Sequence, residues 1–198
     1  MKLITAGVSS FLLREQPFSA FDFPRWHAWL CVILVSIPYA FDPALTGAPS
    51  NMPDDALMPL WAGLILSVFS AVIITAVMVG VLRWWLKRGG RWDGQGSLLN
   101  LLVASTLVTN LFSLVGILLG WPMIVLMPLW LYGIWVNANA ISGAIPGAGL
   151  GYSIAGLCIS VALAFFIFFC MIFVATLAFA LVGIVFLPEG SMLPATDI

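Results

Sequence analysis

Residues 94–188 contain no charged side chain and no histidine, and this long uncharged run constrains the fold more than any other feature of the chain. A soluble protein needs charged and polar side chains to cover its surface. Here 63% of the 198 residues are hydrophobic and only 8% are charged. Because one membrane crossing needs about 20 apolar residues, the run predicts several transmembrane helices joined by short turns.

Turn-forming and charged residues divide the apolar part of the chain into five predicted spans. We therefore predict an all-α polytopic transmembrane helical bundle that occupies residues 28–187. The first span is short, since its uninterrupted apolar part, residues 28–41, would cover about 21 Å of a hydrocarbon core of roughly 30 Å. Before the last span we expect residues 152–157 to form an interfacial lead-in. The five spans are predicted at residues 28–45, 60–82, 98–119, 123–142 and 158–187.

Residues 1–27 precede the first predicted span and mix aromatic side chains with charged ones. Several Phe and Trp residues are interleaved there with Arg14 and Arg25. This pattern is typical of a segment that lies at a membrane surface, so we predict a cytoplasmic interfacial segment. A disordered tail is the alternative, because Pro17 and Pro24 would interrupt a continuous helix.

Two segments, residues 42–59 and 188–198, carry acidic side chains but no basic ones. The first contains four prolines and three aspartates, which favours a stiff loop without a helix. Short loops rich in Lys and Arg tend to stay in the cytoplasm. Since both segments lack such residues, we predict an external loop and an external C-terminal tail.

The sequence RWWLKRGGRWDGQGS at residues 83–97 carries Arg83, Lys87, Arg88 and Arg91, four of the seven positive side chains. A basic loop between two spans indicates the cytoplasmic side of the membrane. With five crossings, this loop places the N terminus in the cytoplasm and the C terminus outside, and it puts all seven cations on one side. We expect the four cations of the loop to contact anionic lipid headgroups.

Apart from Asp42 at the outer end of the first span, no charged side chain lies within the predicted spans. Ion-coupled transporters and proton relays usually need such a group inside the bilayer. The intramembrane polar side chains include Asn100, Asn110, Asn137 and Asn139. We expect them to form hydrogen bonds between helices. The alternative is a polar groove between the third and fourth spans, which would bind a lipid headgroup or a partner helix.

Cys31, Cys158 and Cys170 all lie in apolar stretches and form an odd, widely spaced set. We predict buried free thiols, and neither disulfides nor metal ligands. With one histidine and no Cys-x-x-Cys pair, the sequence indicates no zinc, haem or iron-sulfur site, and we expect no cofactor. A net charge of -1 gives no sign of nucleic-acid binding.

The order of these parts resembles the Yip1 family of small membrane proteins in its short bacterial form. The resemblance extends over residues 18–187. It depends on Gly89, Gly90, Gly96 and Ser97 before the third span and on LWLYGIWVNANAISG in the fourth. The chain lacks the DLYGP-type motif and the long polar tail of the eukaryotic members. The resemblance implies an integral protein of the bacterial cytoplasmic (inner) membrane, without catalytic residues.

The sequence therefore favours a non-enzymatic membrane protein. We expect a membrane-organising or accessory scaffold that acts through helix packing and its basic loop. Its partners would be membrane lipids together with another membrane protein or a second copy of the chain. A permease component or lipid-handling protein, with a groove near Asn110, Asn137 and Asn139, is the main alternative. An intramembrane enzyme has less support, because no paired catalytic groups occur at membrane depth.

Overall fold

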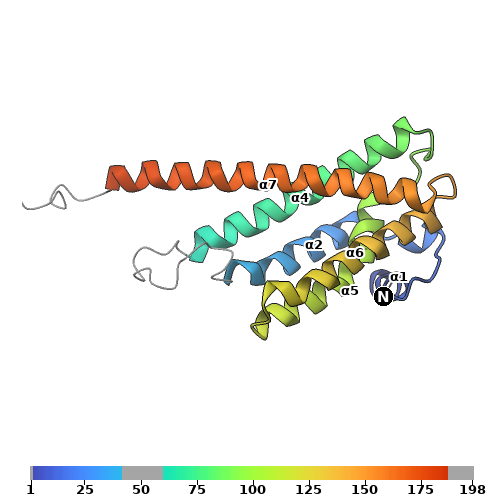
Figure 1. Ribbon diagram of the computed structural model, residues 1–198, viewed down its shortest axis with the longest axis horizontal. Helices are drawn as coiled ribbons and strands as arrows, with labels where there is room; N and C mark the ends of the chain where they lie inside the picture. Colours follow the sequence, from blue (N-terminus) through green and yellow to red (C-terminus); the bar gives the residue numbers. More distant parts are fainter. Residues whose placement is uncertain (1, 42–59, 187–198) are drawn as a thin grey trace, which may run out of the picture.

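The computed structural model describes residues 2–41 and 60–186, and within these ranges all of the regular secondary structure is helical (Figure 1). No strand occurs in the described residues, so the expected all-α bundle is confirmed. The α-helices are α1 (Lys2–Phe11), α2 (Arg25–Ser36), α4 (Leu60–Arg88), α5 (Leu98–Leu118), α6 (Met123–Ala144) and α7 (Leu150–Phe186), and the 3-10 helices are η1 (Phe18–Phe21) and η2 (Ile37–Phe41).

Four helices are long and apolar enough to cross a membrane. They correspond to the last four predicted spans, and they are compatible with a membrane protein. Helix α2 has only 12 residues and is not among the four. The predicted external loop and tail, and the ends of the first and last predicted spans, lie outside the described residues. The four candidate spans are Trp61–Arg88, Leu98–Leu118, Ile124–Ala144 and Leu150–Ala175.

Helix α4 continues beyond residue 82, where we predicted the second span to end, as far as Arg88. Arg83, Lys87 and Arg88 therefore lie on the last turns of a helix, and our placement of them in a loop was wrong. Arg, Lys, Leu and Trp are all compatible with helical backbone. The change from apolar to basic side chains thus marks a change of surroundings and does not mark the end of the helix.

Two helices end in the same glycine-based cap. After α4, Gly90 has a φ of +63°, and the N–H of the next residue donates to the carbonyl of Leu86 at 3.0 Å. After α5, Gly120 has a φ of +70°, and the next N–H donates to the carbonyl of Gly116 at 2.9 Å. A glycine adopts this left-handed conformation at little cost. The second cap turns the chain sharply, so that α5 and α6 form an antiparallel hairpin.

Helix α7 is one continuous helix of 37 residues. It begins at Leu150, so residues 152–157, the predicted lead-in, belong to the helix itself. The connection between α6 and α7 is consequently only residues 145–149. No proline follows Pro146 until residue 188, and nothing else in the apolar sequence stops a helix.

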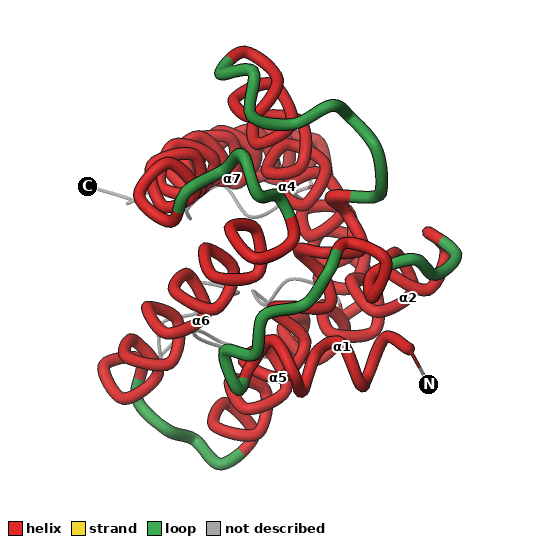
Figure 2. Tube along the Cα trace, turned by 90° about the vertical axis from the view of Figure 1, so that its right-hand side faces the viewer, coloured by secondary structure: helices red, strands yellow, loops and turns green. Residues whose placement is uncertain are grey.

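The long helices run along the long axis of the molecule, and α2 with η2 lies beside them (Figure 1). Helix α5 packs against α1, α2 and α6, while α4 packs against α2 and α7. Figure 2 views the bundle nearly along this axis, and α1 runs across the picture at a large angle to α7. We call the end at which α4 and α6 finish and α5 and α7 start the basic end, because it carries Arg83, Lys87, Arg88 and Arg91.

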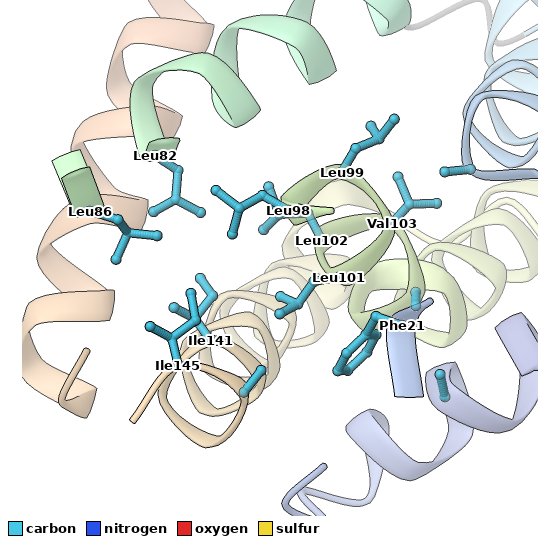
Figure 3. Packing of buried hydrophobic residues seen from close by; sticks show 14 of the residues in the cluster. Phe21, Leu82, Leu86, Leu98, Leu99, Leu101, Leu102, Val103, Ile141 and Ile145 are labelled. Carbon is cyan, nitrogen blue, oxygen red and sulfur yellow. The ribbon is translucent and has the colours of Figure 1, made fainter. Parts of the chain in front are cut away.

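The apolar core lies toward the basic end, where side chains from α4, α5, α6 and η1 meet (Figure 3). Phe21 is 1% exposed and links the N-terminal segment to this core. Helix packing therefore fixes the basic end most firmly. The labelled core residues are Phe21, Leu82, Leu86, Leu98, Leu99, Leu101, Leu102, Val103, Ile141 and Ile145.

The three cysteines are free. Cys31 is partly buried, but Cys158 and Cys170 are exposed, so the prediction of buried thiols was wrong for the two on α7. In a protein that faces lipid, an apolar side chain need not be buried in the protein to leave water. A thiol on the outer surface of a span meets this condition.

Candidate functional site

A cavity of about 750 Å³ lies between α2, η2, α4, α5 and α7. Its lining lies in the middle of the spans, at residues 63–78 of α4, 102–110 of α5 and 168–175 of α7. Most of the lining is apolar. Ile172 lines the cavity and is 37% exposed, so the space opens to the outside of the bundle. The polar lining residues include Ser36, Ser67, Ser70, Thr75, Thr106, Asn110 and Asn137.

The hydroxyl groups of the lining mostly donate to helix carbonyls. Ser67 Oγ donates to the carbonyl of Ser36 at 2.6 Å, which ties α4 to α2. Ser70 Oγ donates to the carbonyl of Ser67 at 3.0 Å, and Thr106 Oγ1 donates to that of Leu102 at 2.8 Å. These protons are already used within the protein, and the cavity walls are consequently less polar than their residue types suggest.

Asn110 is a polar side chain of the cavity that is available to a ligand. It lines the cavity and is half-buried. Among the described residues, no side chain or backbone group forms a hydrogen bond with its carboxamide. A carboxamide offers two N–H donors and one oxygen acceptor. An amphiphile in the cavity would therefore find both kinds of hydrogen-bonding partner at this point of an otherwise apolar wall.

Asn137 also reaches the cavity, but both ends of its side chain are engaged. Its Nδ2 donates to the carbonyl of Gly133 at 2.8 Å, and its Oδ1 accepts from Ser105 Oγ at 2.6 Å. The second bond joins α6 to α5 in a fully buried position. Asn137 therefore fixes the hairpin and presents only part of its surface to the cavity.

The other two asparagines do not line the cavity. Asn100 is buried, and its Nδ2 donates to the carbonyl of Phe21 at 3.0 Å and to that of Phe23 at 2.5 Å. It thereby holds the N-terminal segment on α5. Asn139 Nδ2 donates to the carbonyl of Trp135 at 2.9 Å, one turn earlier in the same helix. The structure thus brings together Asn110 and Asn137 and leaves Asn100 and Asn139 apart from them.

The helices of the α5–α6 hairpin are in direct contact where the sequence suggested a groove. A Cβ atom added at Gly133 would lie 3.4 Å from Thr109 Oγ1. Trp130 Nε1 donates to Ser113 Oγ at 3.2 Å across the same interface. The cavity lies instead on the side of α5 that faces α4 and α7.

The four predicted headgroup contacts are all exposed at the basic end. Arg88 lies 5.2 Å above the ring of Trp84, and Lys87 lies 5.9 Å from the ring of Trp92. Such contacts hold a cation beside an aromatic ring without removing its charge. Arg91 differs, because its Nη1 donates to the carbonyl of Gly147 at 3.2 Å and so joins two loops.

Sequence reasoning missed the contact between Trp85 and Tyr152, which we call the clasp. Trp85 Nε1 donates to the carbonyl of Tyr152 at 3.2 Å, and Tyr152 Oη donates to the carbonyl of Trp85 at 2.7 Å. Their rings stack with centroids 5.0 Å apart. The clasp joins α4 to α7 at the basic end. The only signal in the sequence is that both are interfacial aromatic residues, which does not indicate a pair.

No protein-family model matches the chain, and no curated protein or solved structure matches it either. Within the described residues, no group of three or more His, Cys, Asp or Glu side chains is placed to hold a metal ion. Because the comparisons give no relative, the class of protein is defined by its structure alone. This is an all-helical protein, compatible with a membrane location, with an apolar cavity among its long helices.

Proposed function

We propose that this chain is a non-enzymatic integral membrane protein that binds a membrane lipid in the cavity between α2, α4, α5 and α7. The observation that carries the proposal is the position of the cavity, which is open and apolar at the level of the spans. The hydrocarbon region of a bilayer contains almost no water to fill such a space. An acyl chain is the molecule that is both abundant there and chemically matched to the walls.

Asn110 gives the proposed site its polar contact. An ester carbonyl or a hydroxyl group of a lipid could bond to its free carboxamide, while the chain packs against Leu107, Phe168 and Met171 of the lining. An unpaired carboxamide at this depth is costly. Lipid binding would relieve that cost, and the same residue would select an amphiphile over a plain hydrocarbon.

The proposed topology has five crossings, with a cytoplasmic N terminus and an external C terminus. The support for a first crossing is that η2 extends α2. The 12 residues of α2 and the five of η2 rise about 1.5 and 2.0 Å each, or about 28 Å together, close to a core of roughly 30 Å. The cations at the basic end favour the cytoplasmic side of a bacterial inner membrane, and the Yip1 family remains our proposal for its relatives.

Filling the cavity tests lipid binding. Ala71 lines the cavity from α4, and in Ala71→Trp the indole would occupy the space of an acyl chain. Ile65 lies on the same helix, is 63% exposed and does not line the cavity, which makes Ile65→Trp the matched control. Native mass spectrometry of protein released from mild detergent should show bound lipid in the wild type and in the control, and a several-fold loss in Ala71→Trp.

Equal lipid occupancy in all three proteins would contradict the proposal. Asn110→Leu keeps the volume and removes the hydrogen-bonding groups, so it should reduce the occupancy by lipid while leaving the fold intact. Helix content and elution volume check the fold of each variant.

A second candidate function, the membrane-organising or accessory scaffold, is favoured by the basic end. Arg83, Lys87 and Arg88 are exposed there beside Trp84, which is itself 52% exposed. An interfacial Trp among cations suits an anionic membrane surface or an acidic partner. Affinity purification in mild detergent tests this function: a stoichiometric membrane-protein partner, lost on changing these three cations to Gln, would support it.

A further inference from the structure

Helix α1 packs crosswise against the hairpin and does not lie apart from the bundle. Its inner side is made of the small residues Ala6, Gly7 and Ser10, all buried. A Cβ atom added at Gly7 would lie 3.0 Å from the backbone oxygen of Ala104 in α5. Small residues at such a crossing allow two helix backbones to approach closely, as they do between helices in membranes.

The C-terminal end of α1 reaches the interior of the spanning region. The ring of Phe11 stacks with that of Phe112 at a centroid distance of 5.7 Å and meets the edge of Tyr132 at 5.3 Å. Phe112 lies 14 residues after the start of α5, so the end of α1 lies well below the level at which α5 begins. A helix resting on the headgroups would not reach this depth.

The last four carbonyls of α1 all have hydrogen-bond donors. Those of Val8, Ser9 and Ser10 accept from backbone N–H groups of the following turn at 2.9 to 3.0 Å. The carbonyl of Phe11 accepts from Tyr132 Oη of α6 at 2.6 Å. In water these groups could bond to solvent, but in hydrocarbon each must have a partner within the protein. The end of α1 meets that requirement.

The outer side of α1 is apolar and uncovered. Ile4 is 63% exposed, Val8 45% and Leu12 55%, and their spacing of four residues places them along one helix face. Leu13 continues the surface at 40% exposure with a φ of +55°. Most L-residues adopt this conformation only at a cost of about 1 kcal/mol or more, so the position keeps an apolar side chain where glycine would be less strained.

The surroundings of this face identify what covers it. It continues onto the exposed apolar side chains of α5, among them Phe112 and Val115, which are 53% and 50% exposed. Lys2 and Arg14 lie exposed before and after it, and the exposed Glu15 follows Arg14. Long basic side chains beside an apolar surface can extend to lipid phosphates while their stems remain in the hydrocarbon. Apolar surface flanked by cations matches one leaflet of an anionic bilayer.

We propose that α1 is a non-spanning helix embedded in the leaflet at the basic end, with Ile4, Val8, Leu12 and Leu13 in contact with lipid acyl chains. The protein then occupies more area in that leaflet than its spans alone require. The contact between α1 and lipid does not involve the cavity, so this proposal can be tested separately from the proposed function.

Spin labels on the full chain in vesicles of phosphatidylethanolamine and phosphatidylglycerol test the proposal. The label is attached to Val8→Cys or, one turn earlier, to Ile4→Cys, after replacement of Cys31, Cys158 and Cys170 by Ala. Collisions with oxygen, which dissolves in lipid, are compared with collisions with a water-soluble nickel chelate. Phe169→Cys on the exposed face of α7 provides the lipid reference, and Gln95→Cys in the exposed loop provides the water reference.

We expect both α1 labels to match the lipid reference, with oxygen collisions several-fold more frequent, relative to nickel, than at the water reference. Frequent nickel collisions at both positions would show that α1 lies in water, and they would overturn the proposal. Protection from both reagents would show that a second copy or another protein covers the face, which would also overturn it. Unchanged helix content and elution volume confirm that each labelled protein is folded.

Discussion

The hairpin of α5 and α6 and the pair formed by α4 and α7 are both apolar, but they are buried to very different extents. In its most apolar part, 44% of α5 and 33% of α6 is buried inside the protein, against 6% of α4 and 17% of α7. The more apolar pair is the less buried one, since the mean hydropathy is 2.7 for α4 and 3.0 for α7 against 2.1 for α5 and 1.5 for α6. In lipid, apolar side chains gain little by leaving the solvent, and close contact depends on small and polar residues.

The two helix pairs also differ in the positions of the hydrogen bonds that join their helices. The hairpin has cross-helix hydrogen bonds at two levels, from Ser105 to Asn137 and from Trp130 to Ser113. The pair of α4 and α7 is joined by the clasp at the basic end. Beyond the clasp, the pair borders the cavity. The comparison indicates a hairpin joined by hydrogen bonds at two levels, beside a pair whose hydrogen bonds, among the described residues, lie at the basic end.

Overpacking the hairpin should lower the free energy of unfolding more than any other change considered for these two regions. Gly133→Leu forces a large side chain against Thr109, and overpacking of this kind typically costs about 1–3 kcal/mol. Gly80→Leu is the matched control, since nothing lies within 4 Å of a Cβ atom at Gly80 of α4. The measurement is the free energy of unfolding during titration with sodium dodecyl sulfate. Equal effects of the two substitutions would remove the distinction between the regions.

Removing a buried hydrogen bond should weaken the hairpin by a smaller amount. Asn137→Ala loses the contact with Ser105, and a bond of this type contributes about 0.6 kcal/mol on average and up to about 1.7. Asn139→Ala is the control, because Asn139 bonds only to a carbonyl of its own helix. A double-mutant cycle with Ser105→Ala isolates the pair. A coupling energy of zero would show that the bond does not fasten α5 to α6.

Loosening the clasp should have an effect on stability no larger than that of removing the buried hydrogen bond of Asn137. Trp85→Phe removes the donor to the Tyr152 carbonyl and should lower the free energy of unfolding by about 0.6 kcal/mol. Trp84→Phe changes the exposed neighbour, whose indole nitrogen has no hydrogen-bond partner among the described residues, and should change nothing measurable. If the two variants are equally stable, the clasp does not hold α4 to α7.

Local chemistry made part of the fold predictable. The long apolar segments predicted the four long helices, and the gap of three residues between the third and fourth predicted spans indicated a short turn. The end of α4 was predicted less well, because Arg83, Trp84 and Trp85 change the polarity of the chain without ending the helix. Cys158 and Cys170 were wrongly predicted to be buried, because a side chain that a soluble protein would bury can be exposed in a protein that faces lipid.

The site was less predictable than the spans. Asn110 and Asn137 were both candidates by residue type, but only the tertiary arrangement shows that the first is free and that the second is fastened to Ser105. The cavity depends on how far α4 and α7 stand from α5, and no short motif encodes that distance. Similarly, the small inner face of α1 is confined to Ala6, Gly7 and Ser10, too short a pattern to identify its partner helix.

The clasp has a consequence for the direction in which a bound molecule could be exchanged. Trp85 and Tyr152 join α4 and α7 by hydrogen bonds at the basic end. No other hydrogen bond joins the described parts of these two helices, so they should separate most easily at their opposite ends. The wall of the cavity should therefore yield on the opposite side of the membrane. A lipid held beside Asn110 would enter and leave through the leaflet farther from the cations, so the protein would exchange lipid with only one of the two leaflets.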